Sequence, residues 1–134
     1  MHMLTIKPET MFQALADETR IRIIRLMVTS GEEVCLCEIT DSLNEPQTKL
    51  SRHLKVLRQA GLLSAQKEGR WVYHRLVTGE SHLDHLFAII KGLPDINERY
   101  ATDLANFKTR LCLREDGRCK IEKLATVKKK QREL

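Results

Sequence analysis

A change of hydrophobic periodicity at Gly61 limits the folds that this chain can adopt. Before this glycine, residues 47–60 carry apolar side chains at the spacing of an amphipathic helix, and glycine commonly ends a helix. After it, residues 63–67 and 70–76 have the pattern of a β-hairpin, with Glu68-Gly69 between them as a tight loop. The sequence therefore predicts a helix that leads directly into a two-stranded hairpin.

A second helix is predicted immediately before this one. Ile39 and Leu43 lie four residues apart, which indicates a short helix from about Cys37 to Leu43, and Asn44-Glu45-Pro46 interrupts it. Two helices joined by so short a turn form a helix-turn-helix, and the hairpin that follows is its wing. The expected fold class is α+β, mostly α: a winged helix-turn-helix with flanking helices.

The flanking helices are predicted over about 8–15, 17–30, 81–91 and 96–111. The last two have broad apolar faces that indicate either a dimer interface or cover for the chain's own core, and the residues alone leave both open. We expect residues 1–113 to form one domain with terminal dimerisation helices. Residues 114–134 are predicted to be a basic, flexible C-terminal tail.

The composition excludes several classes of protein. A length of 134 residues with 42% hydrophobic and 31% charged residues suits one globular domain, and no apolar run is long enough to span a membrane. The N-terminus lacks a secretory pattern, so we expect a cytoplasmic location and reduced cysteines. We expect no enzymatic activity, because neither a Gly-rich phosphate loop nor a His-Glu-x-x-His motif is present.

Positive charge is concentrated around the predicted helix and hairpin. The stretch from Pro46 to Arg75 carries seven basic residues and one acid, Glu68, whereas the whole chain has a net charge of only +5. A solvated surface would normally mix both signs, and a positive block on a nearly neutral body is typical of a phosphate-binding face. The charge pattern therefore favours nucleic acid as the partner.

The helix over 47–60 has the side chains needed to read DNA. Its apolar residues Leu50, Leu54 and Leu57 share one face, which we expect to lie in the core. Gln reads adenine and Arg reads guanine with paired hydrogen bonds, while Ser, Thr and Lys mostly hold the backbone. The predicted DNA contacts are Gln47, Thr48, Lys49, Ser51, Arg52, His53 and Lys55 on this helix, with Arg70 beside the hairpin turn, where it can enter a minor groove or bind its phosphates.

Four segments together resemble the ArsR family of bacterial metal-sensing transcriptional repressors, and the likeness covers about Met11 to Leu76. They are Phe12–Arg20, Val34–Ile39, Leu50–Leu54 and Gly69–Tyr73. The arsenical-resistance repressors are the most similar branch, and the cadmium and lead sensors come second. The resemblance implies a homodimer, built through terminal helices, that binds an inverted-repeat operator in double-stranded DNA and leaves it when an inducer binds.

The resemblance also assigns the inducer site. The Cys-x-Cys of these two branches matches Cys35 and Cys37, and the third cysteine common in arsenic sensors is replaced here by Thr40. As(III) and Sb(III) prefer three thiolates, and Cd(II) and Pb(II) also favour sulfur-rich sites. Cys112 and Cys119 are the candidates for the third ligand, from the same chain or from the partner subunit.

A mechanical consequence follows from the spacing of the first two cysteines. Two side chains two residues apart on a regular helix point in diverging directions. Joint ligation by Cys35 and Cys37 is therefore expected to strain or unwind the first turn of their helix. Because that turn lies against the reading helix, the distortion would tilt the reading surface away from the groove.

Other interpretations remain open. A redox-responsive repressor of the same fold would use a disulfide between Cys35 and Cys37 or between Cys112 and Cys119. A zinc site on the helix that begins at Ser81 would use His82, Asp84 and His85, for which surface histidines and a capping aspartate are the plainer explanation. A metal-scavenging or protein-interaction module would place the basic face against an acidic partner.

Overall fold

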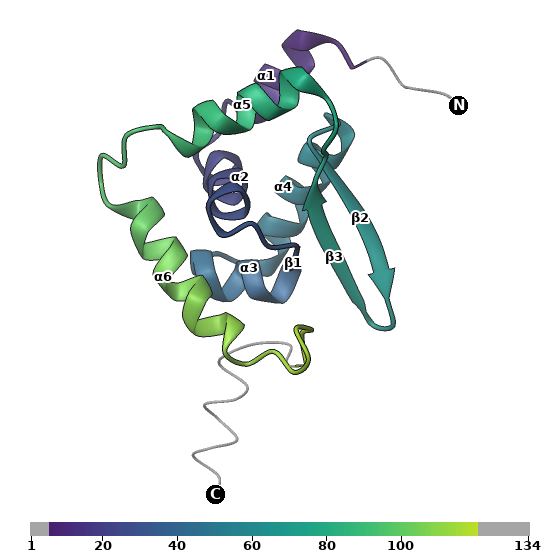
Figure 1. The fold of residues 1–134 in the computed structure, drawn as a ribbon, viewed down its shortest axis with the longest axis vertical. Coiled ribbons are helices and arrows are strands. Elements are labelled where there is room, and N and C mark those ends of the chain that lie inside the picture. The colour runs from purple at the N-terminus through teal and green to yellow at the C-terminus, as the bar shows by residue number, and fades with distance from the viewer. Residues whose placement is uncertain (1–5, 121–134) are drawn as a thin grey trace, which may run out of the picture.

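The computed structural model describes residues 6–120 and shows a helical body from which a β-hairpin projects (Figure 1). The elements, in chain order, are α1 (Pro8–Leu15), α2 (Glu18–Ser30), β1 (Val34–Cys35), α3 (Leu36–Leu43), α4 (Gln47–Gln59), β2 (Leu63–Glu68), β3 (Trp71–Leu76), α5 (Ser81–Lys91) and α6 (Arg99–Leu111). This arrangement confirms the predicted winged helix-turn-helix: α3 and α4 form the helix-turn-helix, and β2 and β3 form the wing.

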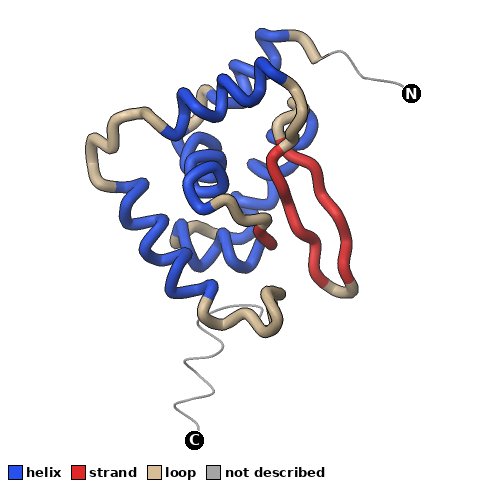
Figure 2. The backbone as a smooth tube through the Cα atoms, in the orientation of Figure 1, coloured by secondary structure: helices blue, strands red, loops and turns tan. Residues whose placement is uncertain are grey.

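The three strands form one antiparallel sheet in the order β1-β3-β2. Glu68 pairs with Trp71, so the two-residue turn is Gly69-Arg70, one position later than the predicted Glu68-Gly69. Gly69 has a φ of 61°, which suits the first central position of a tight hairpin turn. Arg70 therefore lies in the turn itself, at the far end of the hairpin drawn in red in Figure 2.

Local signals account for most helix ends. The carboxylate of Asp17 accepts a hydrogen bond from the Arg20 backbone N–H, which caps α2, and Gly31 ends that helix with a φ of 71°. The start of α6 differs from the expectation, because the helix begins at Arg99 rather than near residue 96. The Asp95 carboxylate accepts hydrogen bonds from the first turn of α6, so the residues between them form a connecting turn.

The core lies beneath α4 and around α2. Leu50, Leu54 and Leu57 of α4 are buried as predicted, and they pack with the apolar residues of α2. The last helix, α6, covers α2 and α3 of its own chain: Phe107 is fully buried, and the Asp103 carboxylate pairs with Arg22 at 2.8 Å. The sequence left open whether α6 forms a dimer interface or covers the core of its own chain, and in the structure α6 covers that core.

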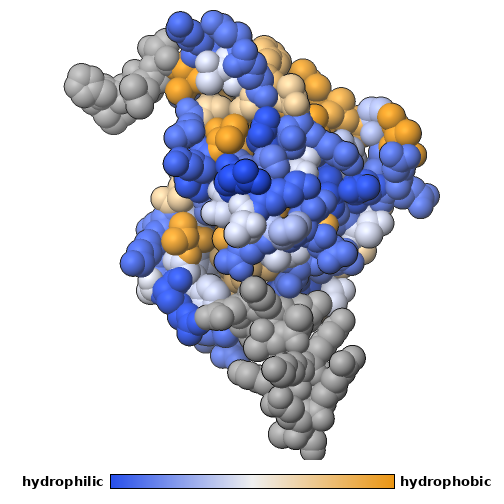
Figure 3. All heavy atoms as spheres, turned by 180° about the vertical axis from the view of Figure 1, so that it is seen from behind, coloured by the Kyte–Doolittle hydropathy of each residue, from blue (hydrophilic) through white to orange (hydrophobic). Residues whose placement is uncertain are grey.

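Exposed apolar side chains remain on α1 and α5. Phe12 is 59% exposed and Ile89 is 62% exposed. Figure 3 shows apolar atoms gathered mainly in the upper part of the rear face, toward the end of the molecule where Figure 1 places α1 and α5. The homodimer stays a prediction, and these two helices are its candidate interface. Over residues 6–120, no helix combines the length and the apolar character needed to cross a bilayer.

Candidate metal centre and nucleic-acid interface

Cys35 and Cys37 lie close together because only one of them belongs to the helix. Cys35 ends β1 and precedes α3 with extended backbone angles, φ −98° and ψ 161°, while Cys37 lies in the first turn of α3. Their Sγ atoms are 2.9 Å apart. The expectation of two diverging thiols on a regular helix was wrong, since the strand-to-helix bend turns both toward one point. Joint ligation therefore requires no unwinding of α3.

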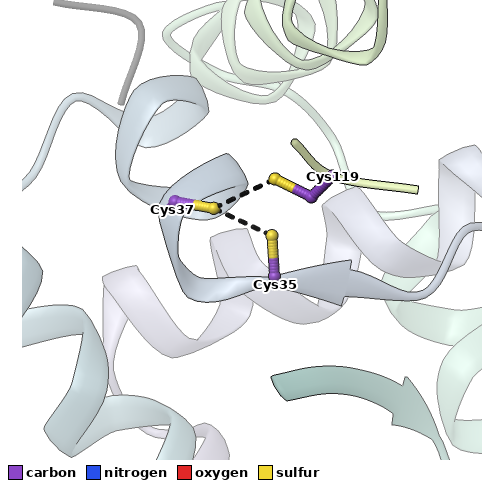
Figure 4. Close-up of side chains that lie close together, drawn as sticks. All are labelled: Cys35, Cys37 and Cys119. Carbon is purple, nitrogen blue, oxygen red and sulfur yellow. Dashed lines mark hydrogen bonds between the residues drawn. The ribbon is translucent and has the colours of Figure 1, made fainter. Parts of the chain in front are cut away.

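The third thiol comes from the chain beyond α6. Residues 112–119 turn back toward β1 and α3 through left-handed backbone at Asp116 and Gly117 and a backbone bridge between Glu115 and Arg118. The Sγ atom of Cys119 lies 3.3 Å from that of Cys37. The three Sγ atoms lie within 4.8 Å of one another and point toward a common centre (Figure 4).

The other predicted ligands lie elsewhere. Cys112 is exposed at the end of α6, and its thiol donates to the Lys108 carbonyl at 3.4 Å. His82 and His85 are exposed on α5, where they contact Glu80 and Ser81. Among residues 6–120, the three thiols form the one group of three or more potential metal ligands that the structure brings together.

Two hydrogen bonds to backbone amides position the cysteines. The Glu38 carboxylate accepts from the Cys35 N–H at 3.1 Å, and Arg114 binds both oxygens of this fully buried carboxylate at 2.6 and 2.8 Å. The Tyr73 hydroxyl accepts from the Cys119 N–H at 2.7 Å. Cys35 is thus held by Glu38 of α3 and, through it, by Arg114 in the segment after α6. Cys119 is held by Tyr73 of β3, the central strand of the sheet.

A buried arginine lies beside the thiols. The Arg110 side chain is fully buried, donates to the Asp41 carboxylate at 2.7 Å and lies 3.5 Å from Cys119 Sγ. Arg114 is likewise balanced by the buried Glu38 and by Glu32. Because each of these cations has an acidic partner, the wall of the site contributes little net charge.

Cys35 and Cys37 resist deprotonation. Hydrogen bonds with Cys119 and Cys37, together with burial, raise the pKa of Cys35. The hydrogen bond with Cys119 and burial raise the pKa of Cys37 to about 12, although Cys35 and the charge of Arg110 act in the opposite direction. At neutral pH these two groups are therefore thiols, and any ligand they bind has to displace their protons.

The predicted DNA contacts gather on one side of α4 and at the wing turn. Those that are exposed are Gln47, Thr48, Ser51, Arg52, Lys55 and Arg70. The other two are partly buried: Lys49 pairs with Glu45 at 3.1 Å, and His53 contacts Arg20 at 3.2 Å. Burial lowers the pKa of His53, so this side chain carries little positive charge for a phosphate.

A groove of about 630 Å³ between α4 and the wing adjoins both the thiols and the predicted DNA contacts. Its walls include Cys35 and Cys37 as well as the predicted DNA contacts Gln47, Ser51 and Arg70. Trp71, on the wing, lines the groove and packs against the thiol cluster. The thiols therefore share a boundary with the surface expected to meet DNA.

Several residues of the site were not predicted from the sequence. Glu38, Tyr73, Arg110, Arg114 and Arg118 all act through contacts between distant segments. Arg110 had one local signal: it follows Phe107 by three residues and so lies on the apolar face of α6. A buried arginine on that face needs an acidic partner, which the partly buried Asp41 supplies.

Comparisons with known proteins agree with the winged helix-turn-helix fold. Residues 17–65 match the family model described as "Bacterial regulatory protein, arsR family". The chain is 41% identical over 95 residues to the arsenic resistance transcriptional regulator ArsR1 of Pseudomonas putida, a match that covers 71% of this chain and 72% of the relative.

Two further relatives match over a shorter region. The arsenical resistance operon repressor of Escherichia coli is 46% identical over 69 residues, 52% of this chain and 58% of the repressor. The cadmium resistance regulatory protein CadC homolog of Staphylococcus aureus is 34% identical over 65 residues, 48% of this chain and 53% of the relative. The match thus spans less than two thirds of these two proteins.

Proposed function

Because this chain belongs to the ArsR family of bacterial regulatory proteins, we propose that it represses a metalloid-resistance operon and leaves its operator when As(III) or Sb(III) binds Cys35, Cys37 and Cys119. The observation that carries this proposal is the convergence of three thiols from β1, α3 and the segment after α6. Three sulfur atoms in a pyramid are the coordination that these trivalent ions prefer.

The protonated state of the thiols suits arsenous acid. In the reaction As(OH)₃ + 3 RSH → As(SR)₃ + 3 H₂O, three As–O and three S–H bonds break while three As–S bonds form. Each leaving hydroxide takes up one thiol proton, so the raised pKa values of Cys35 and Cys37 do not oppose binding. The product is neutral and matches the balanced pairs of Arg110 with Asp41 and Arg114 with Glu38.

A divalent cation fits the same site less well. Binding of Cd(II) or Pb(II) has to release the protons of Cys35 and Cys37 to solvent, and a divalent ion held by three thiolates leaves a centre with one negative charge. Deprotonation is opposed by the high thiol pKa values, and a buried uncompensated charge is costly. Cadmium or lead induction, the alternative suggested by the related cadmium regulator, is therefore the weaker candidate.

The DNA-binding half of the proposal depends on α4 and the wing. The exposed side chains of α4 enter the major groove of the operator, and Arg70 in the wing turn reaches an adjacent minor groove. A homodimer formed through α1 and α5, whose Phe12 and Ile89 are exposed, would present two such units to an inverted repeat.

The test is release of a labelled operator duplex by arsenite, with the protein kept reduced by a phosphine. Cys37→Ser and Cys119→Ser should each need at least about tenfold more arsenite, since each removes one of three sulfur ligands. Cys112→Ser, which alters an exposed thiol outside the cluster, is the matched control and should respond like the wild type. A full response by Cys37→Ser would contradict the proposed site.

Oxidation is the second candidate stimulus, because the Sγ atoms of Cys37 and Cys119 lie only 3.3 Å apart. Hydrogen peroxide would take two electrons and two protons from this pair to form a disulfide and two water molecules. Release by peroxide that dithiothreitol reverses, without release by arsenite, would favour the redox interpretation. Release by arsenite in the presence of reductant would favour the metalloid.

A further inference from the structure

The segment that supplies the third thiol also contacts the wing. We name residues 114–119 the C-terminal strap. Arg118, one residue before Cys119, donates to the Glu33 carboxylate at 2.6 Å and to the Glu68 carboxylate at 3.1 Å. Glu68 is the last residue of β2, directly before the Gly69-Arg70 turn. The strap thus connects the thiol cluster to the end of the wing.

A second contact connects the strap to the middle of the wing. The Arg118 guanidinium lies over the Tyr73 ring, 4.5 Å from its centroid, while the Tyr73 hydroxyl accepts the Cys119 N–H. Glu33 in turn pairs with Arg75 of β3 at 3.0 Å. Arg118 therefore contacts both strands of the hairpin, β2 through Glu68 and β3 through Tyr73. The backbone of Cys119 is held to β3 as well, through the Tyr73 hydroxyl.

We propose that Arg118 is a positioning residue that transmits ion capture at Cys119 to the wing, holding the hairpin in a position that operator DNA does not accept. This inference rests on the proposed function, which supplies the ion. It replaces the unwinding of α3, which the strand-to-helix bend at Cys35 makes unnecessary.

The free-energy cost of forming the Arg118 contacts depends on whether the strap is already ordered. Arg118 and Glu68 have side chains that are 38% and 35% exposed, so their ion pair alone is worth little in water. A pair of this kind must offset the entropy of ordering the segment that carries it. Once three As–S bonds hold Cys119, that entropy has already been lost, and Arg118 forms its contacts at much smaller cost.

Linkage makes the coupling reciprocal. If the ion favours the strap-bound wing and DNA favours another wing position, then DNA must weaken the affinity for the ion by the same factor. Loss of the Arg118 contacts should reduce this factor without removing any sulfur ligand. The arsenite affinities of the free and the operator-bound protein are therefore expected to move closer together in a variant that lacks these contacts.

The experiment compares Arg118→Gln and Glu68→Gln with the wild type in the full chain. Arsenite affinity is measured with and without saturating operator by the fluorescence of Trp71, the single tryptophan, which packs against the cluster of Cys35, Tyr73 and Cys119. Operator release by arsenite is measured in parallel, relative to each variant's own affinity for DNA. Arg99→Gln, which breaks an exposed pair with Glu18 outside the strap and the wing, is the matched control.

We expect both glutamine variants to bind arsenite about fivefold more weakly than the wild type without DNA and within about twofold of it on the operator, so that arsenite releases less operator. A fivefold change lies within the usual range of allosteric coupling. An unchanged release curve would overturn the inference. An equal loss of arsenite affinity with and without operator would also overturn it, because Arg118 would then only assemble the ligand site. If arsenite fails to release the wild type, the proposed function itself is wrong.

Discussion

The Sγ atom of Cys119 lies 3.3 Å from the Sγ atom of Cys37, although 82 residues separate them along the chain. A hydrogen-bonded backbone turn brings them together, and the Tyr73 hydroxyl receives the Cys119 amide. The thiol centre is therefore assembled from the helix-turn-helix, the wing and the C-terminal strap at once.

The affinity for arsenite should depend little on pH between 6 and 8, whereas the affinity for Cd(II) should rise steeply. Cys37, with a pKa of about 12, and Cys35, with a raised pKa, are protonated throughout this range. Each proton that a cation must displace changes its affinity about tenfold per pH unit, while arsenous acid removes the protons as water. Titrations of both ligands against Trp71 fluorescence measure the two slopes. Parallel slopes would contradict the proton balance proposed here.

Arg52→Ala should cost about 1–3 kcal/mol of operator binding and relax specificity at one base pair, if Arg52 reads a base. Its side chain is exposed on α4, on the helix side opposite the buried leucines. Lys55→Ala, on the same exposed side, should weaken all duplexes alike and lower the salt dependence. Binding to an operator and to a panel of single-base variants distinguishes the two. A uniform loss for Arg52→Ala would assign Arg52 to a phosphate.

His74 should make the fold sensitive to acid. Burial lowers the pKa of this histidine to about 4, and the positive charge of Arg58 acts in the same direction. Since the unfolded chain has the ordinary pKa near 6.5, it binds more protons than the folded chain between about pH 6.5 and 4. Stability should therefore fall as the pH drops through this window, by about 1–3 kcal/mol from this group.

Urea unfolding at several pH values tests this, with His74→Gln as the comparison. The glutamine variant retains a polar side chain for Arg58 but cannot titrate. Its stability should decline less than that of the wild type between pH 6.5 and 4. Equal declines in both proteins would show that other groups cause the acid sensitivity.

Phe12→Lys and Ile89→Lys should each shift the protein from dimer to monomer. These side chains are exposed apolar groups on α1 and α5, and a lysine in an apolar interface leaves a charge without water. Sedimentation velocity across a range of concentrations measures the change. Ile96→Lys is a suitable control, because Ile96 is 85% exposed in the turn before α6. A dimer that tolerates both interface variants would place the contact elsewhere.

The structure differs from the sequence-based prediction at the hairpin turn and at Cys35. The hairpin was predicted, but its turn lies one residue later, because Gly69 rather than Glu68 adopts the left-handed conformation at the first turn position. Cys35 and Cys37 were predicted as ligands on one helix. The pairing of Val34 and Cys35 with β3 instead keeps Cys35 extended, which no local pattern of two residues could indicate.

Local spacing along the chain was enough to predict the helix-turn-helix, the wing and the buried face of α4, because periodicity and capping act between residues a few positions apart. The third ligand, the buried ion pairs of Arg110 and Arg114, and the link from Arg118 to Glu68 depend on the tertiary structure. Each of these contacts joins segments far apart in the chain, where neither hydrophobic periodicity nor capping can indicate which residues meet. Only packing decides which of two equally plausible cysteines, Cys112 or Cys119, meets the other thiols.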